Sequence, residues 1–370
     1  MRCTPCGPKN AKIALVGEAP GAEEERLGTP FVGGSGQELN RCLSTAGINR
    51  DDCWLTNVFL NRPPGNKLHL EWCRNKIVAK AAYVELLPIF REQYPTFEWP
   101  NVYNWSSLAQ GRYLMPQHLP ELIRLRDELV ELKPNLVIAL GGTPTWALLG
   151  IGGISKLRGA VAASSLVPEQ KVLPTWHPAY VQRVWTSRSV LITDLMKAKS
   201  ESQFANIVRP SRKIWINPCI ADIIHFRKEY IEGCDLLSFD IETANKQITC
   251  ISFAPRDDIA LIIPFVDRTK PSYHYWESLE EEVAAWKEVR TILNLPMPKL
   301  AQNGLYDLQY LWRQHHIPVR NFLEDLMLLH HSIFLELPKD LGFLGSVYTS
   351  EPAWKLMRTR VKDSTDKKDE

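Results

Sequence analysis

The sequence lacks any apolar run close to the roughly 20 residues that a membrane-spanning helix needs. No signal peptide opens it either. An excess of one charge is also missing, because 44 Lys and Arg stand against 42 Asp and Glu, for a formal net charge of +2. Any nucleic-acid binding must therefore come from local basic patches and not from a global field. These absences are typical of a globular cytoplasmic protein, and no internal repeat is visible.

A disulfide framework is not expected, although the chain has eight cysteines, because its overall character is intracellular. Cys42, Cys53, Cys234 and Cys250 are interpreted as lying inside apolar runs, as ordinary small core residues. Cys3 and Cys6 differ, because C-T-P-C is a C-x-x-C pair of the kind that forms half of a metal or cluster site. One such pair alone does not establish a site.

The chain is expected to divide near its middle, because 370 residues are too many for one typical domain and fit two. The polar segment 200–213 contains Pro210 and has no convincing period, so it predicts a connection between domains. We expect a first domain over 1–205, a linker over 206–212, a second domain over 213–355 and a disordered charged tail over 356–370.

Strand-like and helix-like patterns alternate in the first half, which predicts an α/β domain with a parallel sheet and helices on both faces. The expected strands cover 12–16, 53–59, 135–140 and 171–175, and the expected helices cover 36–46, 119–132 and 143–149. Ligands in such folds bind at the carboxyl ends of the strands. Polar residues stand at the ends of three of these strands, at 18–31, at Asn57 and at 175–178. We expect them to lie close together.

The loop after the first strand, G-E-A-P-G-A-E-E-E-R-L-G-T-P-F, does not suit a phosphate. A phosphate loop would end in Gly-Lys-Ser/Thr, and this loop has no lysine. The loop does not fit the dinucleotide-binding fingerprint G-x-G-x-x-G either, because Glu18, Pro20 and the acidic run interrupt that pattern. Carboxylates beside an aromatic ring suit another task, in which they position a water or stabilise a developing cation while the ring offers a stacking face.

These residues resemble the family 4 uracil-DNA glycosylases and their relatives in that superfamily. The matching pieces occur in the family's order over about 1–200, apart from an insertion near 76–118. They are the opening loop, T-N-V-F-L-N-R-P-P-G-N, L-G-G-T-P-T-W-A-L-L-G, K-L-R-G and T-W-H-P-A-Y-V-Q-R. The resemblance implies a three-layer αβα fold with a parallel sheet, and removal of uracil from DNA by hydrolysis of the N-glycosidic bond.

The resemblance implies catalytic roles for two carboxylates and a histidine. Cleavage of the N-glycosidic bond builds positive charge on the sugar and negative charge on the departing uracil. Glu24 would act on the sugar or on the attacking water, and Glu18 would shape the pocket. His177 would donate a hydrogen bond to the uracil oxygen as charge develops there. The neighbouring Glu23 and Glu25 suit a solvated helix start equally well, because carboxylates are favourable at a helix N-terminus.

The resemblance also implies residues that hold the extrahelical base. Asn57 would accept from the uracil N3–H and donate to O4, a pattern that cytosine reverses. Phe31 would stack on the base. The rest of the implied site consists of Gly17 and Ala19 at the uracil and Arg183 at the DNA. Taken singly, each of these residues also fits an ordinary structural role.

One part of the sequence departs from this family. Family 4 enzymes usually carry four cysteines that bind a 4Fe–4S cluster. Cys3, Cys6 and Cys73 match three of them, but Asn61 stands where the cysteine before R-P-P-G-N is expected. A cluster on three thiolates and loss of the cluster both stay open, and loss is the simpler interpretation.

The second half contains a different pair of acidic residues. Asp240 and Glu242 alternate with apolar neighbours in F-D-I-E-T, so both carboxylates point to one face of a strand. Two like charges side by side are costly unless a cation lies between them, and divalent metals are the usual solution. A polar strand face opposite a buried one explains the same pattern without a metal. The surrounding pattern predicts a mixed sheet from strands within 235–254 and 259–265, with helices near 278–293 and 305–314.

This half resembles the DEDD-type 3′–5′ proofreading exonucleases at the front of family A DNA polymerases, in particular the phage versions. F-D-I-E-T matches their first motif and Q-N-G-L-Y-D-L-Q-Y-L their second, which adds Asn303 and Asp307 to the site of Asp240 and Glu242. The resemblance implies a ribonuclease H-like, mixed-sheet domain with a Mg²⁺ or Mn²⁺ site.

The third exonuclease motif, a Tyr followed by Asp four residues later, is missing. Tyr348 has Pro352 at that spacing. The fourth metal-binding carboxylate is then not supplied, unless another acidic residue such as Asp325 replaces it. We therefore expect an incomplete exonuclease domain, in a chain that stops before any polymerase domain.

Together these features predict a phage-derived, DNA-processing protein of the bacterial host cytoplasm, with a uracil-DNA glycosylase domain fused to an incomplete exonuclease domain. Its expected partners are uracil-containing single- or double-stranded DNA and a separately encoded DNA polymerase fragment. The alternative is a non-catalytic DNA-binding replication accessory, or the front fragment of a split polymerase. A nucleotide-binding α/β protein is disfavoured, because the phosphate-loop lysine is absent.

Overall fold

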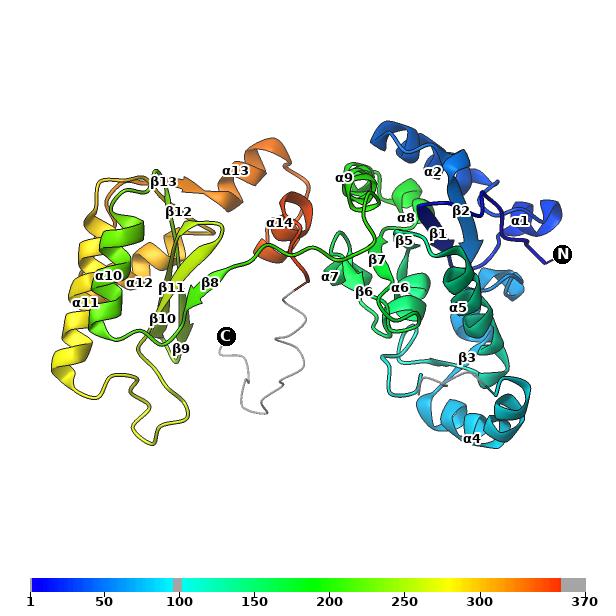
Figure 1. The fold of residues 1–370 in the computed structure, drawn as a ribbon, viewed down its shortest axis with the longest axis horizontal. Coiled ribbons are helices and arrows are strands. Elements are labelled where there is room, and N and C mark those ends of the chain that lie inside the picture. Colours follow the sequence, from blue (N-terminus) through cyan, green and yellow to red (C-terminus); the bar gives the residue numbers. More distant parts are fainter. Residues whose placement is uncertain (1, 96–101, 354–370) are drawn as a thin grey trace. The chain divides into compact units, whose positions relative to one another are not determined.

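The computed structural model describes residues 2–95 and 102–353. The chain forms two compact units (Figure 1), one made of Met1–Val208 with Gly342–Glu370 and the other of Arg209–Leu341. The helix α14 (Leu341–Tyr348), which the sequence placed in the second domain, thus groups with the first unit. The tail expected at 356–370 lies outside the described residues.

Two basic side chains of the first unit hold α14. Arg158 Nη1 donates to Ser346 Oγ at 2.7 Å, and Lys197 Nζ donates to the Thr349 carbonyl at 2.6 Å. The guanidinium of Arg158 also forms an ion pair with Asp194, and both of these side chains are almost completely buried. Contacts of this kind join residues that are far apart in the sequence. They produce no periodic sequence pattern from which they could be predicted.

The first unit is built on a sheet with the strand order β2-β1-β5-β7-β6. Four strands are parallel and fully buried, as is typical of apolar runs covered on both faces, and β6 is antiparallel to β7. The strands are β1 (Ile13–Gly17), β2 (Cys53–Asn57), β5 (Leu136–Leu140), β6 (Ala162–Ala163) and β7 (Lys171–Thr175). The parallel sheet expected from the sequence is confirmed.

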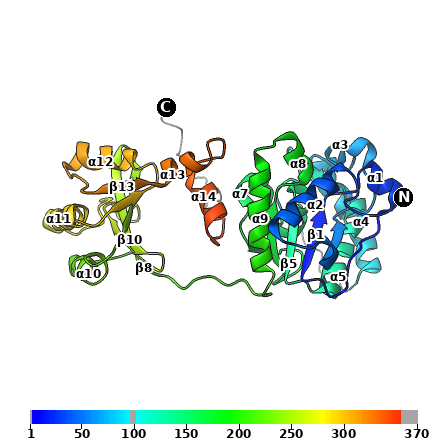
Figure 2. The ribbon, with the colours of Figure 1, turned by 90° about the horizontal axis from the view of Figure 1, so that it is seen from above.

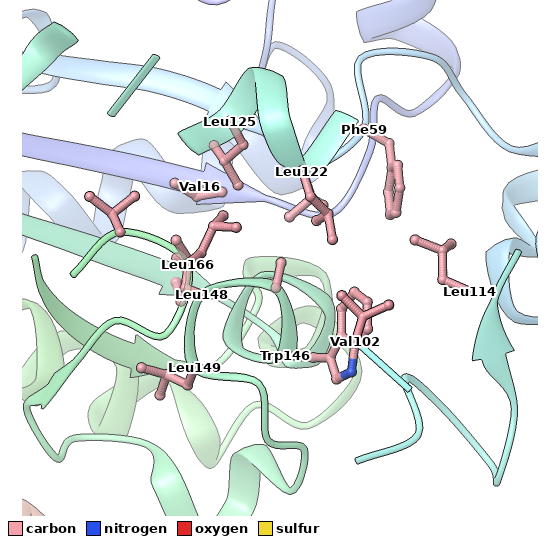
Figure 3. Packing of buried hydrophobic residues seen from close by; sticks show 14 of the residues in the cluster. Val16, Phe59, Val102, Leu114, Leu122, Leu125, Trp146, Leu148, Leu149 and Leu166 are labelled. Carbon is pink, nitrogen blue, oxygen red and sulfur yellow. The ribbon is translucent and has the colours of Figure 1, made fainter. Parts of the chain in front are cut away.

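Alternate residues of these strands enter two separate apolar clusters. In β1, Ile13 and Leu15 pack on the face covered by the helices α2 (Gly34–Ala46), α8 (Pro178–Arg183) and α9 (Ser187–Glu201). Ala14 and Val16 pack on the opposite face, which α5 (Pro120–Leu132) and α6 (Gly142–Leu149) cover. Figure 3 shows the second face, where Val16 of β1 shares one apolar cluster with Leu122 and Leu125 of α5. Helices therefore lie on both faces of the sheet, which confirms the three-layer αβα arrangement.

The helices of the first unit connect and flank these strands (Figure 1). They are α1 (Ala22–Leu27), α2 (Gly34–Ala46), α3 (Leu68–Glu71), α4 (Lys76–Gln93), α5 (Pro120–Leu132), α6 (Gly142–Leu149), α7 (Ile154–Leu157), α8 (Pro178–Arg183) and α9 (Ser187–Glu201), with short 3₁₀ turns at Arg50–Asp52, Pro64–Asn66 and Pro116–His118.

The segment that the sequence marked as an insertion near 76–118 carries α4 and the strand β4 (Tyr113–Leu114), which pairs with β3 (Cys73–Arg74). The Asn75 side chain caps α4 by accepting from the Val78 N–H at 3.0 Å. Tyr103 is buried against the same core and donates its hydroxyl to the Leu114 carbonyl at 3.0 Å. The described part of this segment thus extends the core of the first unit.

The second unit contains a mixed sheet with the order β13-β12-β9-β10-β11-β8. Its centre is the antiparallel meander that the sequence predicts, formed by β9, β10 and β11, while β8, β12 and β13 join in parallel. The strands are β8 (Lys213–Trp215), β9 (Leu237–Ala244), β10 (Gln247–Arg256), β11 (Ile259–Pro264), β12 (Lys299–Ala301) and β13 (Phe322–Asp325).

Helices flank this second sheet (Figure 2) and share one apolar core with it. They are α10 (Ile220–Phe226), continued by a π-helical turn at Arg227–Ile231, α11 (Leu279–Asn294) and α12 (Leu305–His315). The helix α13 (Leu326–Ile333) follows β13. The helices expected near 278–293 and 305–314 are confirmed as α11 and α12. Across the described residues of both units, no helix is long and apolar enough to cross a membrane.

Candidate active site

A pocket of about 480 Å³ opens at the carboxyl ends of the parallel strands of the first unit. All three polar segments that the sequence analysis singled out contribute to its wall. The lining includes most of the predicted site residues, namely Glu18, Ala19, Glu24, Phe31, Asn57, His177 and Arg183. The fold thus brings together predicted site residues from three separate stretches of the chain.

Gly17 lies directly behind this wall, at the end of β1 opposite Asn57 of β2. A Cβ atom at Gly17 would be 2.3 Å from Asn57 Oδ1 and 2.7 Å from Phe31 Cζ. Both distances are far inside van der Waals contact, so only glycine lets the amide and the ring approach the strand end this closely.

The Phe31 ring is held in place by an unusual backbone. Its φ of 55° is in the left-handed region, which is rare for a residue with a side chain. Gly36 lies against the same peptide, since a Cβ there would be 1.9 Å from the Phe31 carbonyl oxygen. Strain of this kind persists only where the surroundings impose it, and here it keeps the ring in the pocket wall.

Glu24 is a fixed and buried carboxylate, with 7% of its surface exposed. Its Oε1 accepts the backbone N–H groups of Val32 at 3.1 Å and Gly33 at 2.8 Å. The adjacent glutamates behave differently, because Glu23 pairs with Arg26 and Glu25 with Arg62. Of these three neighbouring carboxylates, Glu24 is the one that lines the pocket.

Glu18 lines the pocket from the first residue after β1. Its carboxylate accepts a hydrogen bond from the Thr143 hydroxyl at the start of α6. Its carbonyl accepts from the Phe59 N–H at 3.0 Å, which continues the pairing of β1 with β2 beyond the strands. Both the side chain and the backbone of Glu18 are therefore fixed relative to the strand ends.

His177 caps the N-terminus of α8, because its Nδ1 accepts the Ala179 N–H at 3.1 Å. In the neutral ring the proton is then on Nε2. Burial lowers the pKa of His177 to about 4, and the charge of Arg183 acts in the same direction, against the opposing effect of Glu24. At neutral pH the pocket therefore contains an uncharged imidazole that can donate one hydrogen bond.

Known proteins match this part of the chain. A family model of the uracil DNA glycosylase superfamily matches residues 4–209. The chain belongs to this superfamily. It is 29% identical over 198 residues to a type-4 uracil-DNA glycosylase of Thermotoga maritima, a match that covers 52% of this chain and 79% of that protein. Over 55 residues it is 51% identical to the type-4 enzyme of Pyrobaculum aerophilum, covering 15% of this chain and 28% of that protein.

Solved structures similar to this chain include the Aedes aegypti Nibbler EXO domain. The match has a TM-score of 0.29 and 14% identity, and it covers 40% of this chain and 74% of that one. Similarity at this level says nothing about activity.

The sequence analysis did not single out several residues that line the pocket of this glycosylase unit, among them Tyr180 and Asn66. Tyr180 lies one turn into α8, with its ring 4.7 Å from that of Trp176. Tyr180 lies in the motif T-W-H-P-A-Y and Asn66 in R-P-P-G-N, and both motifs carry the family resemblance. Their place in these motifs was the sequence signal that could have identified them as pocket residues.

The cysteines of the glycosylase unit do not fit a 4Fe–4S cluster. Cys6 forms a β-bridge with Leu55 of β2, and the Cys3 N–H donates to the carbonyl of Leu60, beyond the end of that strand, at 2.8 Å. Burial raises the pKa of the Cys3 thiol to about 11 and that of Cys73 to about 12. In the described parts of the chain, no three cysteine, histidine or acidic side chains are grouped to hold a metal, and Asn61 supplies no thiolate.

In the second unit, Asp240 and Glu242 are exposed on one face of β9, and Asp307 of α12 is buried beside that strand. Asp307 Oδ1 accepts the Ile241 N–H at 2.9 Å. Burial raises the pKa of Asp307 to about 6, and the charges of Asp240 and Asp325 add to this effect. Across 2–95 and 102–353, these carboxylates do not form a group of three that could hold a metal.

Asp325, the acidic residue considered as a replacement ligand, has a structural role instead. Its carboxylate accepts the N–H groups of Asn303 at 3.0 Å, Gly304 at 2.9 Å and Met327 at 2.9 Å. Asn303 has a left-handed φ of 55°, so these bonds stabilise the sharp turn before α12. Asn303 therefore contributes its backbone to this turn, and Asp325 caps α13.

Proposed function

We propose that this protein is a uracil-DNA glycosylase that hydrolyses the N-glycosidic bond of deoxyuridine in DNA. The observation that carries the proposal is the convergence of Glu24, Asn57 and His177 on one pocket of about 480 Å³. A volume in this range accommodates a base and its sugar. Membership of the uracil DNA glycosylase superfamily supports the same conclusion.

Base selection is assigned to Asn57 and Phe31. The Asn57 amide offers one acceptor and one donor, which match N3–H and O4 of uracil and oppose the corresponding groups of cytosine. Phe31 provides a fixed aromatic surface on which the base can stack. The missing side chain of Gly17 leaves room for the amide and the ring to lie against the end of β1, where both face the base.

Bond cleavage is assigned to His177 and Glu24. The neutral imidazole donates from Nε2 to the uracil oxygen on which negative charge develops. Glu24, held by two backbone N–H groups, stabilises the positive charge on the sugar or orients the attacking water. Arg183 at the pocket rim is placed to contact a DNA phosphate. No step in this scheme needs a metal ion.

The second unit is proposed to be an exonuclease-like domain of a phage-type DNA polymerase, acting on DNA in the host cytoplasm together with a separately encoded polymerase fragment. Its support is the pair Asp240 and Glu242 on one strand face, with Asp307 beside them. The competing function for the whole chain is a non-catalytic DNA-binding accessory, which predicts DNA binding without base release.

An incision assay separates these two functions. Single- and double-stranded oligonucleotides with one uracil, and matched oligonucleotides with thymine, are incubated with the protein and then cleaved with alkali at abasic sites. The glycosylase proposal predicts a single cut at the uracil position and none in the thymine control. Binding of both oligonucleotides without a cut would instead support the accessory function.

A further inference from the structure

The strand β2 lies at the edge of the sheet of the glycosylase unit, so its outward carbonyls need partners other than a strand. The N-terminal segment supplies one of these partners, because the Cys6 N–H donates to the Leu55 carbonyl at 3.0 Å. Two residues further on, the carbonyl of Asn57 accepts from Arg124 Nη2 at 2.6 Å. The same Nη2 also donates to the Val58 carbonyl at 2.9 Å.

Arg124 is itself held in one orientation on α5. Its Nε donates to Glu121 at 2.9 Å, and its Nη1 forms an ion pair with Glu128. Glu128 in turn accepts from Trp54 Nε1 at 2.5 Å, which connects the cluster back to β2. The Arg124 side chain is only 19% exposed. A guanidinium with fixed, branched donors suits this arrangement, whereas a lysine ammonium cannot reproduce it.

We propose that Arg124 is a positioning residue, which fixes the peptide groups on both sides of Val58 and thereby orients the Asn57 amide toward the uracil. This inference rests on the proposed glycosylase function. Asn57 Oδ1 already lies at contact distance from Gly17, so even a small movement of the Asn57 backbone changes the angle of the amide. Arg124 is absent from the pocket lining, so it acts on the base only through Asn57.

The first test compares Arg124→Lys with the wild type in single-turnover release of uracil. We expect a rate lower by about 10- to 100-fold, the scale of a displacement of about 1 Å at a reacting group. The dissociation constant for DNA should stay unchanged, because Arg124 is absent from the pocket lining and its donors are bonded within the protein. Arg126→Lys is the matched control, since Arg126 lies on the same helix and pairs with Asp127, and it should keep the wild-type rate.

A double-mutant cycle separates positioning from a general structural role. In an Asn57→Ala background the Arg124→Lys change should cost less than about 3-fold, because the amide that Arg124 orients is gone. In a His177→Ala background the full 10- to 100-fold loss should persist. An equal loss in both backgrounds would overturn the inference, as would an effect confined to DNA affinity.

Glu128→Gln is a second variant, in case Arg124→Lys does not fold. It keeps the size of the side chain but removes the charged partner of Arg124, so it should show a smaller loss with the same dependence on Asn57. Failure of the wild type to release uracil would contradict the proposed function itself. Release by the wild type, with variant effects that are independent of Asn57, would contradict only the role of Arg124.

Discussion

Nδ1 of His177 accepts the backbone N–H of Ala179 at 3.1 Å, so the histidine that faces the pocket is also the cap of the helix that follows it. This one contact determines which ring nitrogen carries the proton in the neutral form. It also relates the local fold to the proposed chemistry, because Nε2–H is left as the donor toward the base.

The first prediction concerns pH. Because the pKa of His177 is lowered to about 4, the rate of uracil release should not fall as pH decreases through 6.5, where an ordinary histidine becomes charged. The loss attributable to His177 should begin only near pH 4. Single-turnover rates between pH 4 and 8 test this. A decline centred near 6.5 that is absent from His177→Gln would show that the ring titrates normally.

The same lowered pKa predicts a change in stability. Between pH 6.5 and about 4 the unfolded chain binds a proton at His177 that the folded chain does not bind, so this residue destabilises the fold as pH falls through that window. Thermal melting of the wild type and of His177→Gln measures the effect. The variant should lose less stability than the wild type over the window, and parallel losses would contradict the prediction.

Substitution of Asn57 by Asp should weaken discrimination between uracil and cytosine. A protonated carboxyl group presents a donor and acceptor pattern that the fixed amide does not. The ratio of release rates from matched uracil and cytosine oligonucleotides measures this change. If the variant is active and its preference for uracil over cytosine is unchanged, Asn57 does not take part in base recognition.

The protein should contain no iron. In the described parts of the chain no three cysteine, histidine or acidic side chains are grouped to hold a metal, and Asn61 replaces one expected ligand. Anaerobically purified protein should lack iron by elemental analysis and should lack the visible absorption of a cluster. Cys6→Ser should keep the wild-type rate of uracil release. About four irons per chain, lost together with activity in Cys6→Ser, would contradict this.

The second unit should bind Mn²⁺ or Mg²⁺ only weakly and should show little or no 3′–5′ degradation of single-stranded DNA. Two-metal hydrolysis needs carboxylates that hold both ions about 3.5–4 Å apart. The Asp325 carboxylate instead accepts three backbone N–H groups. Titration with Mn²⁺ and a gel assay of labelled oligonucleotides test both points. Metal-dependent shortening from the 3′ end that disappears in Asp240→Ala would contradict this prediction.

The sequence predicted the strands and the polar residues at their ends, because buried parallel strands are continuous apolar runs and parallel strands end at the same edge. It could not predict the contacts that orient those residues. Arg124 reaches the Asn57 carbonyl across 67 positions of sequence, and nothing periodic marks it among the other charged residues of α5. The family resemblance singled out Glu24 among the neighbouring glutamates, but its bonds to Val32 and Gly33 were not predictable, because they depend on how the loop folds back.

The position of α14 was not predictable for a related reason. Its sequence continues the exonuclease-like pattern, yet Ser346 is bonded to Arg158, 188 positions earlier. This helix is bonded by the arginine of a buried ion pair and by a lysine. Local secondary-structure propensity carries no information about such distant partners. In the second unit, Asp325 was considered as a metal ligand from its charge alone, whereas its hydrogen bonds assign it to a turn.

The central claim is that the pocket of Glu24, Asn57 and His177 releases uracil without a metal. The most direct measurement is mass spectrometry of free uracil from single-stranded uracil DNA, with excess EDTA present, for the wild type and for His177→Ala. The account predicts release of one uracil per site by the wild type in EDTA, and a rate lower by about two to three orders of magnitude in the variant, the scale of one lost hydrogen-bond donor to a developing oxyanion. No free uracil from a wild-type protein that binds the DNA, or equal rates in the two proteins, would contradict it.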